Sequence, residues 1–180
     1  MKVIAFTGMP FSGKSEAVEI AKNLEITVVR MGEMVWEEVK KQALDLTSEN
    51  VGRVAHEMRL TGGMDIWAQK TIQKIKEMNV SFTIVVDGIR NSEEINAFKQ
   101  FFGPDFFLIS IDASDNIRHQ RAFSRKRIDD SANIEDIIKR DEREIKWGVK
   151  KVMEKADKKV KNEESLQSFQ KKIKHFFHSI

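Results

Sequence analysis

The sequence predicts an α/β fold, a three-layer arrangement in which helices cover both faces of a parallel sheet. Two observations predict it. Short apolar runs, the pattern of buried strands, alternate along the chain with longer segments of helical period. The first run leads at once into a glycine-rich turn, Gly8-Met9-Pro10-Phe11-Ser12-Gly13-Lys14-Ser15, that opens a helix. Strands that alternate with helices form parallel sheets joined by right-handed crossovers.

Five short strands are expected, and helical segments separate them along the chain. They are Val3–Thr7, Thr27–Met31, Phe82–Asp87, Phe106–Asp112 and Asp157–Asn162. Segments of helical period fill the intervals. They are Lys14–Asn23, Ser48–Leu60, Asp65–Met78, Ser92–Phe102, the long stretch Ser114–Lys155, and about Ser165 to Phe177. The last strand contains Lys158-Lys159-Val160-Lys161, which is nearly all charged, so we expect it at an edge of the sheet.

Length and composition favour one globular domain over residues 1–180. The chain is 41% apolar and 33% charged, which is an ordinary globular balance. Cysteine is absent, which excludes disulfides, zinc–thiolate sites and thiol nucleophiles. The formal net charge of +3 permits an anionic ligand without requiring nucleic acid. The apolar runs are too short to cross a bilayer, so we expect a cytoplasmic protein with no membrane partner.

The turn from Gly8 to Ser15 has the Gly-x-x-x-x-Gly-Lys-Ser spacing of a phosphate-binding P-loop. Glycines let the backbone curl so that amide N–H groups point at phosphates, and the following helix adds its positive end. Lys14 supplies a charge to the β and γ phosphates, and the Ser15 hydroxyl can ligate magnesium. We therefore predict ATP and Mg²⁺ as ligands; the alternative is an ordinary glycine-rich turn. The predicted nucleotide-binding residues of the loop are Gly8, Pro10, Ser12, Gly13, Lys14 and Ser15.

Asp87 ends the third predicted strand, at the sheet edge where open α/β proteins bind their ligands. It is therefore predicted to orient magnesium, together with Ser15. The alternative is a role as N-cap of the helix at Ser92. No glutamate follows Asp87 directly, which argues against a hydrolytic motor and favours transfer to a bound acceptor.

An arginine-rich region follows the fourth strand, at about residues 118–143. Arginine suits phosphate oxygens and neutralises charge that develops during phosphoryl transfer, so we interpret this region as a short lid. Its basic residues are Arg118, Arg121, Arg125, Lys126, Arg127, Arg140 and Arg143. One alternative is a solvated basic face paired with nearby acids. Another is a nucleic-acid surface, which the scarcity of aromatic residues disfavours without excluding it.

A long helical insertion, about residues 32–79, separates the second strand from the third. In a kinase an acceptor lies in such a segment, opposite the P-loop. Arg59 within it and Arg90 after the third strand are candidates to bind an acceptor phosphate; the alternative for Arg59 is a surface charge. Glu33, just past the second strand, is the candidate carboxylate for a hydroxyl acceptor. Its alternative is a first-turn charge favoured by the helix dipole.

Several of these segments together resemble the archaeal nucleotide-monophosphate-kinase-related family, also described as adenylate-kinase-related or dephospho-CoA-kinase-like. The similarity runs almost end to end. It rests on the P-loop, Met31-Gly32-Glu33, Asp87-Gly88-Ile89-Arg90, the lid segment from Arg121 to Asp130, Arg140-Asp141-Glu142-Arg143-Glu144, and Ala156-Asp157 with Asn162. The resemblance implies a P-loop NTPase fold whose five-stranded parallel sheet has the order 2-3-1-4-5.

The resemblance also implies roles for single residues. The segment from Asp87 to Arg90 looks like the Asp-Gly-x-Pro-Arg segment of adenylate kinases, which implies that Arg90 contacts the acceptor phosphate. Asn162 falls where such kinases hold adenine with backbone groups. Three residues depart from the family pattern. Phe11 replaces a glycine, Trp36 an arginine that helps to bind the acceptor phosphate, and Lys126 a lid glycine.

The leading hypothesis is a magnesium–ATP-dependent kinase that acts on an AMP-like monophosphate, where positioning and charge neutralisation make a general base unnecessary. The predicted catalytic residues are Lys14, Arg90, Arg121, Arg127 and Arg140. The predicted acceptor-binding residues are Glu33, Arg59, Asp87, Gly88 and Arg90. One alternative is a dephospho-CoA-type kinase acting on a hydroxyl. The other is a nucleotide-dependent switch or assembly factor that binds RNA or protein and hydrolyses ATP slowly.

Overall fold

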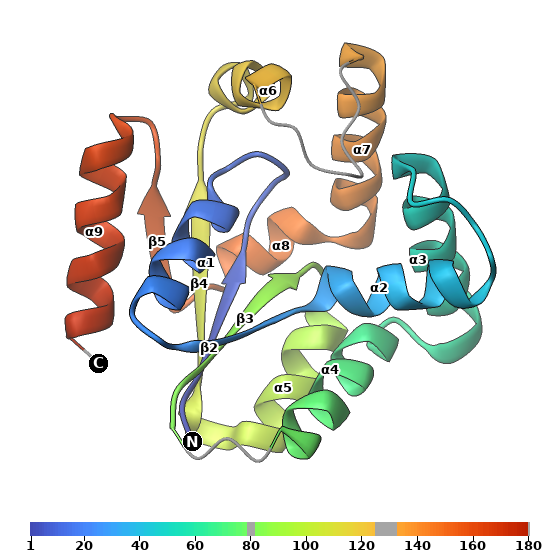
Figure 1. The fold of residues 1–180 in the computed structure, drawn as a ribbon, viewed down its shortest axis with the longest axis horizontal. Coiled ribbons are helices and arrows are strands. Elements are labelled where there is room, and N and C mark those ends of the chain that lie inside the picture. Colours follow the sequence, from blue (N-terminus) through green and yellow to red (C-terminus); the bar gives the residue numbers. More distant parts are fainter. Residues whose placement is uncertain (79–81, 125–132, 180) are drawn as a thin grey trace.

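The sheet has five parallel strands in the order β2-β3-β1-β4-β5 in the computed structural model (Figure 1). The structure describes residues 1–78, 82–124 and 133–179. The strands are β1 Val3–Thr7, β2 Thr27–Arg30, β3 Ile84–Ile89, β4 Phe106–Asp112 and β5 Lys158–Lys161. This order confirms the three-layer P-loop NTPase architecture that the sequence predicted.

Helices cover both faces of the sheet and stand beyond one of its ends (Figure 1). One face carries α1 Lys14–Asn23 and α9 Leu166–His178. The helices that pack on the other side are α2 Met31–Lys41, α3 Ser48–Gly62, α4 Ile66–Glu77, α5 Ser92–Phe102 and α8 Val149–Glu154. A short 3₁₀ turn, Gly103–Asp105, precedes β4, while α6 Asp115–Ser124 and α7 Ile134–Trp147 stand beyond the carboxyl ends of the strands.

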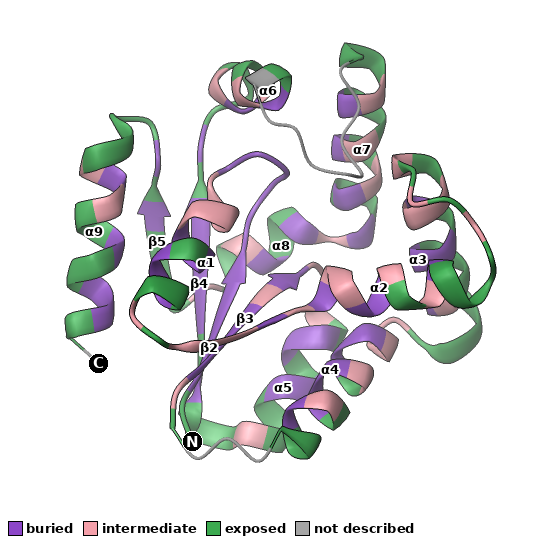
Figure 2. Cartoon of the chain, viewed as in Figure 1, coloured by how far each residue is buried: buried purple, intermediate pink, exposed green. Residues whose placement is uncertain are grey.

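Alternation along the central strands builds two separate apolar layers. On β1, Val3 and Ala5 point into the layer formed with α2, α4 and α5, whereas Ile4 and Phe6 point into the layer formed with α1 and α9. β1 is buried on both faces, as Figure 2 shows, and each fully buried Val, Ile or Phe side chain contributes roughly 1.5–3 kcal/mol. In β5 only Val160 is buried, which confirms the edge position expected from its charges.

The third strand begins and ends two residues later than predicted, at Ile84 and Ile89. Phe82 does not join it, because its side chain is 81% exposed and pairing with β1 starts at Ile84. The strand continues past Asp87 through a register shift beside β1, where Gly88 takes a φ of 112°. Asp87 therefore lies within β3, still near its carboxyl end.

The end of one strand and the extent of one helical segment also differ from what the sequence predicted. The second strand ends at Arg30 rather than Met31, because Arg30 is already the N-cap of α2. The long stretch Ser114–Lys155 is not continuous, since it contains α6, α7 and α8, and Gly148 with a φ of 109° separates the last two. Residues 125–132, which include Arg125, Lys126 and Arg127 of the predicted lid, lie outside the described residues. None of the described helices is long and apolar enough to cross a membrane.

Candidate functional site

Two neighbouring cavities lie at the carboxyl ends of the strands. The large cavity, of about 760 Å³, is bounded by the P-loop, the end of β3 and residues of α6 and α7. The small cavity, of about 50 Å³, is enclosed by α2, α3 and α7. Four residues line both cavities and form the boundary between them: Gly32, Arg90, Arg140 and Glu144.

The P-loop joins β1 to α1 and requires glycine at two positions. Gly8 and Gly13 have φ values of 147° and 111°, which L side chains rarely adopt. A Cβ on Gly8 would lie 2.2 Å from the carbonyl oxygen of Ile111, and one on Gly13 would lie 2.1 Å from Asn162 Nδ2. The loop therefore approaches its neighbours more closely than any larger residue would allow.

The Lys14 ammonium lies inside the loop. Its Nζ donates to the carbonyl oxygens of Gly8 and Met9 at 2.6 and 2.9 Å. Burial lowers the pKa of Lys14 from its ordinary value of 10.5 to about 8, although the negative charge of Asp87 acts in the opposite direction. The loop thus holds a cation that desolvation disfavours and that a polyanion would stabilise.

Arg121, predicted to be catalytic, and Asn162, predicted to bind the nucleotide, both bind the P-loop backbone. Asn162 Nδ2 donates to the Ser12 carbonyl oxygen at 2.9 Å, and Arg121 donates to the Ser12 and Asn162 carbonyl oxygens at 3.4 and 3.0 Å. The Asn162 N–H donates to the carbonyl oxygen of Asp112 at 2.7 Å. The backbone groups that the resemblance assigned to adenine are thus already bonded within the protein. Both residues still line the large cavity.

Arg118 is the most buried arginine among the described residues of the arginine-rich region, with 1% of its surface exposed. Its guanidinium pairs with Asp141 of α7 at 2.7 Å and donates to the Pro10 carbonyl oxygen at 2.9 Å. A solvated basic face, one of the two alternatives for this region, therefore does not describe Arg118. The Arg118 side chain instead connects α6, on which it lies, to α7 and to the P-loop.

Phe11 occupies the loop position where the family pattern has glycine. Its φ of 62° is left-handed, a conformation that costs a non-glycine residue roughly 1–2 kcal/mol. The side chain is only 6% exposed and packs against Ala122 of α6 and Ile137 of α7. Burial of the ring offsets the backbone strain.

Asp87 has the environment expected of a cation ligand. Its Oδ1 is buried and has no hydrogen-bond partner among the described residues, while the side chain lines the large cavity together with Lys14 and Ser15. The alternative role as a helix N-cap is wrong. Asn91 caps α5, because its side chain accepts a hydrogen bond from the Glu94 N–H at 2.7 Å.

Arg90 is held at the boundary between the cavities by Glu144. Arg90 Nε donates to Glu144 Oε2 at 2.5 Å, and Nη1 donates to the Gly88 carbonyl oxygen at 2.7 Å. Burial alone would raise the pKa of Glu144, but Arg90 and Arg140 outweigh it and hold this pKa below its ordinary value. Glu144 is therefore an ionised carboxylate. Arg140, which like Arg90 was predicted to be catalytic, also lines both cavities.

Arg59, predicted to bind an acceptor phosphate, is 3% exposed and is not the surface charge that was its alternative. Its Nη2 pairs with Glu94 at 2.8 Å, and the other oxygen of Glu94 accepts from the Arg90 N–H at 2.7 Å. The guanidinium also lies over the Trp147 ring, 4.3 Å from its centroid. Arg59 lines the small cavity, and through Glu94 it fixes the backbone of Arg90.

Three tryptophans, Trp36, Trp67 and Trp147, line the small cavity. Arg143 lines it as well, 5.7 Å from the Trp147 centroid, and lies so close to α3 that a Cβ on Gly52 would be 2.2 Å from its Nη1. The cavity is thus walled by rings and guanidinium groups. Guanidinium groups beside ring faces are the kind of lining that attracts a small anionic group.

Glu33 lies apart from these residues. It is on the first turn of α2, its side chain is 41% exposed, and Arg30 is 3.9 Å away. It is not among the residues that line either cavity. The first-turn position agrees with its alternative role as a charge favoured by the helix dipole.

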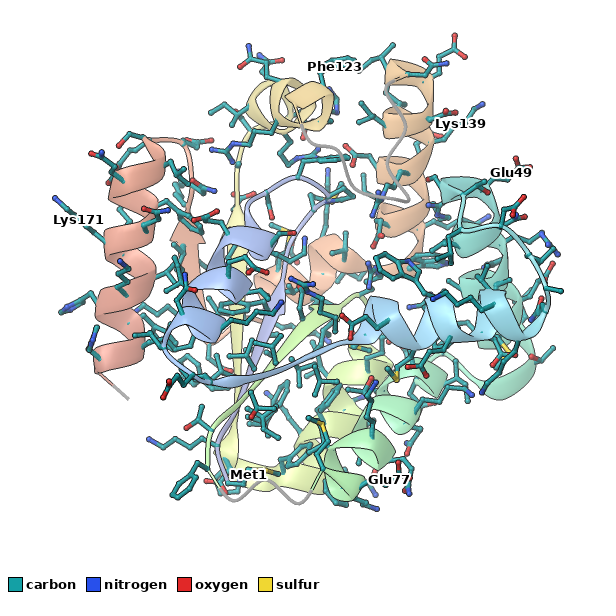
Figure 3. All side chains as sticks on the ribbon, in the orientation of Figure 1. Met1, Glu49, Glu77, Phe123, Lys139 and Lys171 are labelled. Atoms are coloured by element: carbon teal, nitrogen blue, oxygen red, sulfur yellow. The ribbon has the colours of Figure 1, made fainter. Side chains whose placement is uncertain are left out.

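Neither Glu94 nor Glu144 was predicted from the sequence to have a role in the site. The sequence does contain a pattern that indicates the orientation of Glu144, because residues 137, 140, 144 and 147 share one face of a helix. Another face of α7 carries exposed side chains such as Lys139 (Figure 3). Helical period could therefore have indicated that Glu144 points inward, although not that its partner is Arg90.

Comparison with known proteins shows the family and the fold of this chain. The chain matches the AAA domain family over residues 7–138. A UPF0200 protein of Methanosarcina acetivorans is 41% identical over 96% of this chain and 92% of its own length, and one of Methanoculleus marisnigri is 44% identical over 97% and 94%. The chain belongs to the UPF0200 family. These relatives are archaeal, as the resemblance implied, and the family name states no activity.

A UPF0200/UPF0201 protein of Archaeoglobus fulgidus is 47% identical, but the chain spans only 54% of that protein's length. Among solved structures, the chain is similar to shikimate kinase of Aquifex aeolicus, with a TM-score of 0.53, 20% identity, and 98% and 96% of the two chains covered. It is also similar to TT1252 of Thermus thermophilus, with a TM-score of 0.63, 15% identity, and 99% and 97% covered. The UPF0200 chain therefore has a P-loop kinase-like fold.

The partly buried ammonium of Lys14 should make the stability of the protein depend on pH in a specific way. The unfolded chain retains a lysine proton up to about pH 10.5, whereas the folded protein releases it near pH 8, so folding disfavours the protonated form. The free energy of unfolding should therefore rise with pH through this window. We expect Lys14→Met to be more stable than the wild type at pH 7, with a difference that shrinks toward pH 10.5. Urea titrations followed by circular dichroism measure this; a difference constant with pH would contradict it.

The Arg59–Glu94 pair should be important for folding. Arg59→Met leaves the Glu94 carboxylate buried without its charged partner, and we expect a loss of about 3–5 kcal/mol in the free energy of unfolding. The double variant Arg59→Met/Glu94→Leu removes both charges, so it should be less destabilised than the sum of the two single variants. Urea denaturation of the four proteins measures this coupling, and additive losses would argue against it.

Proposed function

We propose that the protein binds magnesium–ATP in the large cavity and transfers the γ-phosphoryl group to an AMP-like acceptor whose phosphate enters at the small cavity. One observation carries this proposal: the cavity at the P-loop and the cavity of rings and arginines share a wall made of Gly32, Arg90, Arg140 and Glu144. A volume of about 760 Å³ lies within the ordinary range of ligand sites. A donor and an acceptor would therefore meet at Arg90 and Arg140.

The P-loop would bind the triphosphate. Its amide groups and the positive end of α1 favour phosphate oxygens, and Lys14 gains a partner for its disfavoured charge. Ser15 and the buried Asp87 Oδ1 fit a divalent cation, directly or through water. Magnesium bound there would neutralise charge on the β and γ phosphate oxygens.

In the reaction, an acceptor phosphate oxygen bonds to the γ-phosphorus while the bond to the β–γ bridging oxygen breaks and ADP leaves. Arg90, Arg140 and Lys14 stabilise the charge on the transferred group. Glu144 is ionised and bonded to Arg90, so it positions the guanidinium. Since Glu33 is not at the cavities, a phosphate acceptor, which needs no general base, is favoured over a hydroxyl.

The small cavity holds less than a whole acceptor. About 50 Å³ accommodates a few water molecules or one small anionic group. Entry of a nucleoside monophosphate therefore requires α3 to separate from α7. Such a movement would part Arg143 from Gly52 and Trp147 from His56, whose Nδ1 lies 3.4 Å from Trp147 Nε1.

A transfer assay tests the proposed reaction. Purified protein is incubated with magnesium and ATP, and with AMP, other nucleoside monophosphates or dephospho-CoA as acceptor, and the products are separated by chromatography. We expect a nucleoside diphosphate product in the wild type, loss of turnover in Lys14→Ala, and only a small effect of Glu33→Gln. Formation of CoA would identify a hydroxyl kinase instead. Binding of ATP with no transfer, together with salt-dependent RNA binding, would support the switch hypothesis.

Gly32 provides a separate test of the shared wall. A Cβ built on this residue meets no atom within 4 Å, and its φ is not in the left-handed range, so the fold should accept a side chain there. We expect Gly32→Phe to fill the junction of the cavities and to lower the transfer rate by about tenfold or more. Gly32→Ala is the matched control and should retain the rate. Full activity of Gly32→Phe would mean that donor and acceptor do not meet at this wall.

A further inference from the structure

The P-loop lies against one face of α6. Arg118, Arg121 and Ala122 are spaced by three and four residues, so they share that face. Arg118 and Arg121 donate to the carbonyl oxygens of the residues on either side of Phe11, at 2.9 and 3.4 Å. Ala122 packs against the Phe11 ring between these two contacts. The loop and α6 are thus joined by hydrogen bonds at both flanks of Phe11.

Phe11 extends this contact to α7. Its ring packs on Ile137, which is 2% exposed, and the Arg140 guanidinium lies 5.6 Å from the ring centroid. Arg140 and Glu144 follow Ile137 on the same face of α7 and line both cavities. The ring therefore sits where the P-loop, α6 and α7 meet.

The left-handed backbone conformation of Phe11 indicates that the ring has a role of its own. A φ of 62° is open to glycine at no cost, yet the position carries the side chain and the strain. A loop that only cradled phosphates would need no ring here. The ring must therefore contribute something other than the path of the loop, and what it contacts is the inward face of α7.

We propose that Phe11 is a positioning residue that couples the P-loop to α7, so that phosphates bound by the loop fix the place of Arg140. When the loop closes around phosphates, its backbone and the Phe11 ring become ordered together. The ring then restrains Ile137 and the turn of α7 that carries Arg140. The hydrogen-exchange readout of this inference rests on the proposed function only in requiring that a nucleotide binds at the P-loop, whereas its kinetic readout also requires the proposed transfer.

Three substitutions at Phe11 separate the possible contributions. Phe11→Leu keeps an apolar side chain where the P-loop packs against α6 and α7. Phe11→Ala removes the ring but keeps the left-handed strain, whereas Phe11→Gly removes both. Phe123→Ala is the matched control, because Phe123 lies on α6 (Figure 3) but is 55% exposed. Circular dichroism checks that each variant is folded.

Hydrogen exchange of the α7 amides with and without magnesium–ATP is the direct readout, and it needs no acceptor. We expect the nucleotide to slow exchange in both α1 and α7 of the wild type, Phe11→Leu and Phe123→Ala. In Phe11→Ala and Phe11→Gly, slowing should persist in α1 and largely disappear in α7. Calorimetry should show ATP dissociation constants within about threefold of the wild type, while kcat falls by about tenfold or more with little change in KM for ATP.

Three other outcomes would contradict the proposed coupling. Undiminished slowing of α7 exchange in Phe11→Ala and Phe11→Gly would overturn the coupling while leaving nucleotide binding intact. A parallel loss of ATP affinity in the Ala, Gly and Leu variants would mean that Phe11 shapes the loop itself, which also contradicts the coupling. Failure of the wild type to bind magnesium–ATP would overturn the proposed function, and the coupling with it.

Discussion

The curled backbone of the P-loop imposes the main constraint on this structure, because some of its carbonyl groups need hydrogen-bond donors from distant parts of the chain. The carbonyl oxygens of Pro10 and Ser12 accept hydrogen bonds from Arg118, Arg121 and Asn162. These donors follow β4 and β5 in the chain, so the loop is completed only when the far half of the sheet has formed. A phosphate site at the amino end of the sequence thus depends on residues that come more than a hundred positions later.

A second set of contacts orders the small cavity. Arg59, Glu94, Arg90 and Glu144 alternate in sign and connect α3, α5, the end of β3 and α7. Buried charges are tolerated when each has an opposite neighbour, and removal of one leaves the next uncompensated. The mutual placement of the helices around the small cavity is therefore electrostatic as well as apolar. Any opening of this cavity must proceed around the Arg90–Glu144 pair or break it.

Local sequence features predicted most of the fold. The P-loop spacing, the apolar strands and the charged fifth strand each have a local physical cause, and the resemblance supplied the strand order. The predicted end of β3 was wrong because a register shift at Gly88 depends on pairing with β1, not on the composition of the strand itself. The start of α2 at Met31 was also missed, because the N-cap residue makes no side-chain hydrogen bond that would mark the start of a helix.

The site was predictable where chemistry is local and unpredictable where it depends on distant pairs. Lys14, Ser15 and Asp87 lie together at the large cavity, as the P-loop spacing and the position of Asp87 near the end of a strand implied. The partners of Arg59 and Arg90 lie 35 and 54 positions away, and no spacing rule indicates them. Asn162 was assigned by resemblance to the adenine, whereas its amide and backbone serve the loop and β4.

The position of the aromatic residues has a spectroscopic consequence. The chain has three tryptophans and no tyrosine, and all three tryptophans line the small cavity, Trp147 beneath the guanidinium of Arg59. The tryptophan emission of the unlabelled protein therefore originates entirely at this one place, and no tyrosine contributes to it. Quenching of tryptophan emission by a dissolved collisional agent would report on the exposure of the small cavity alone, with no contribution from tryptophans elsewhere in the chain. The protein thus carries a native optical reporter on one of its two cavities.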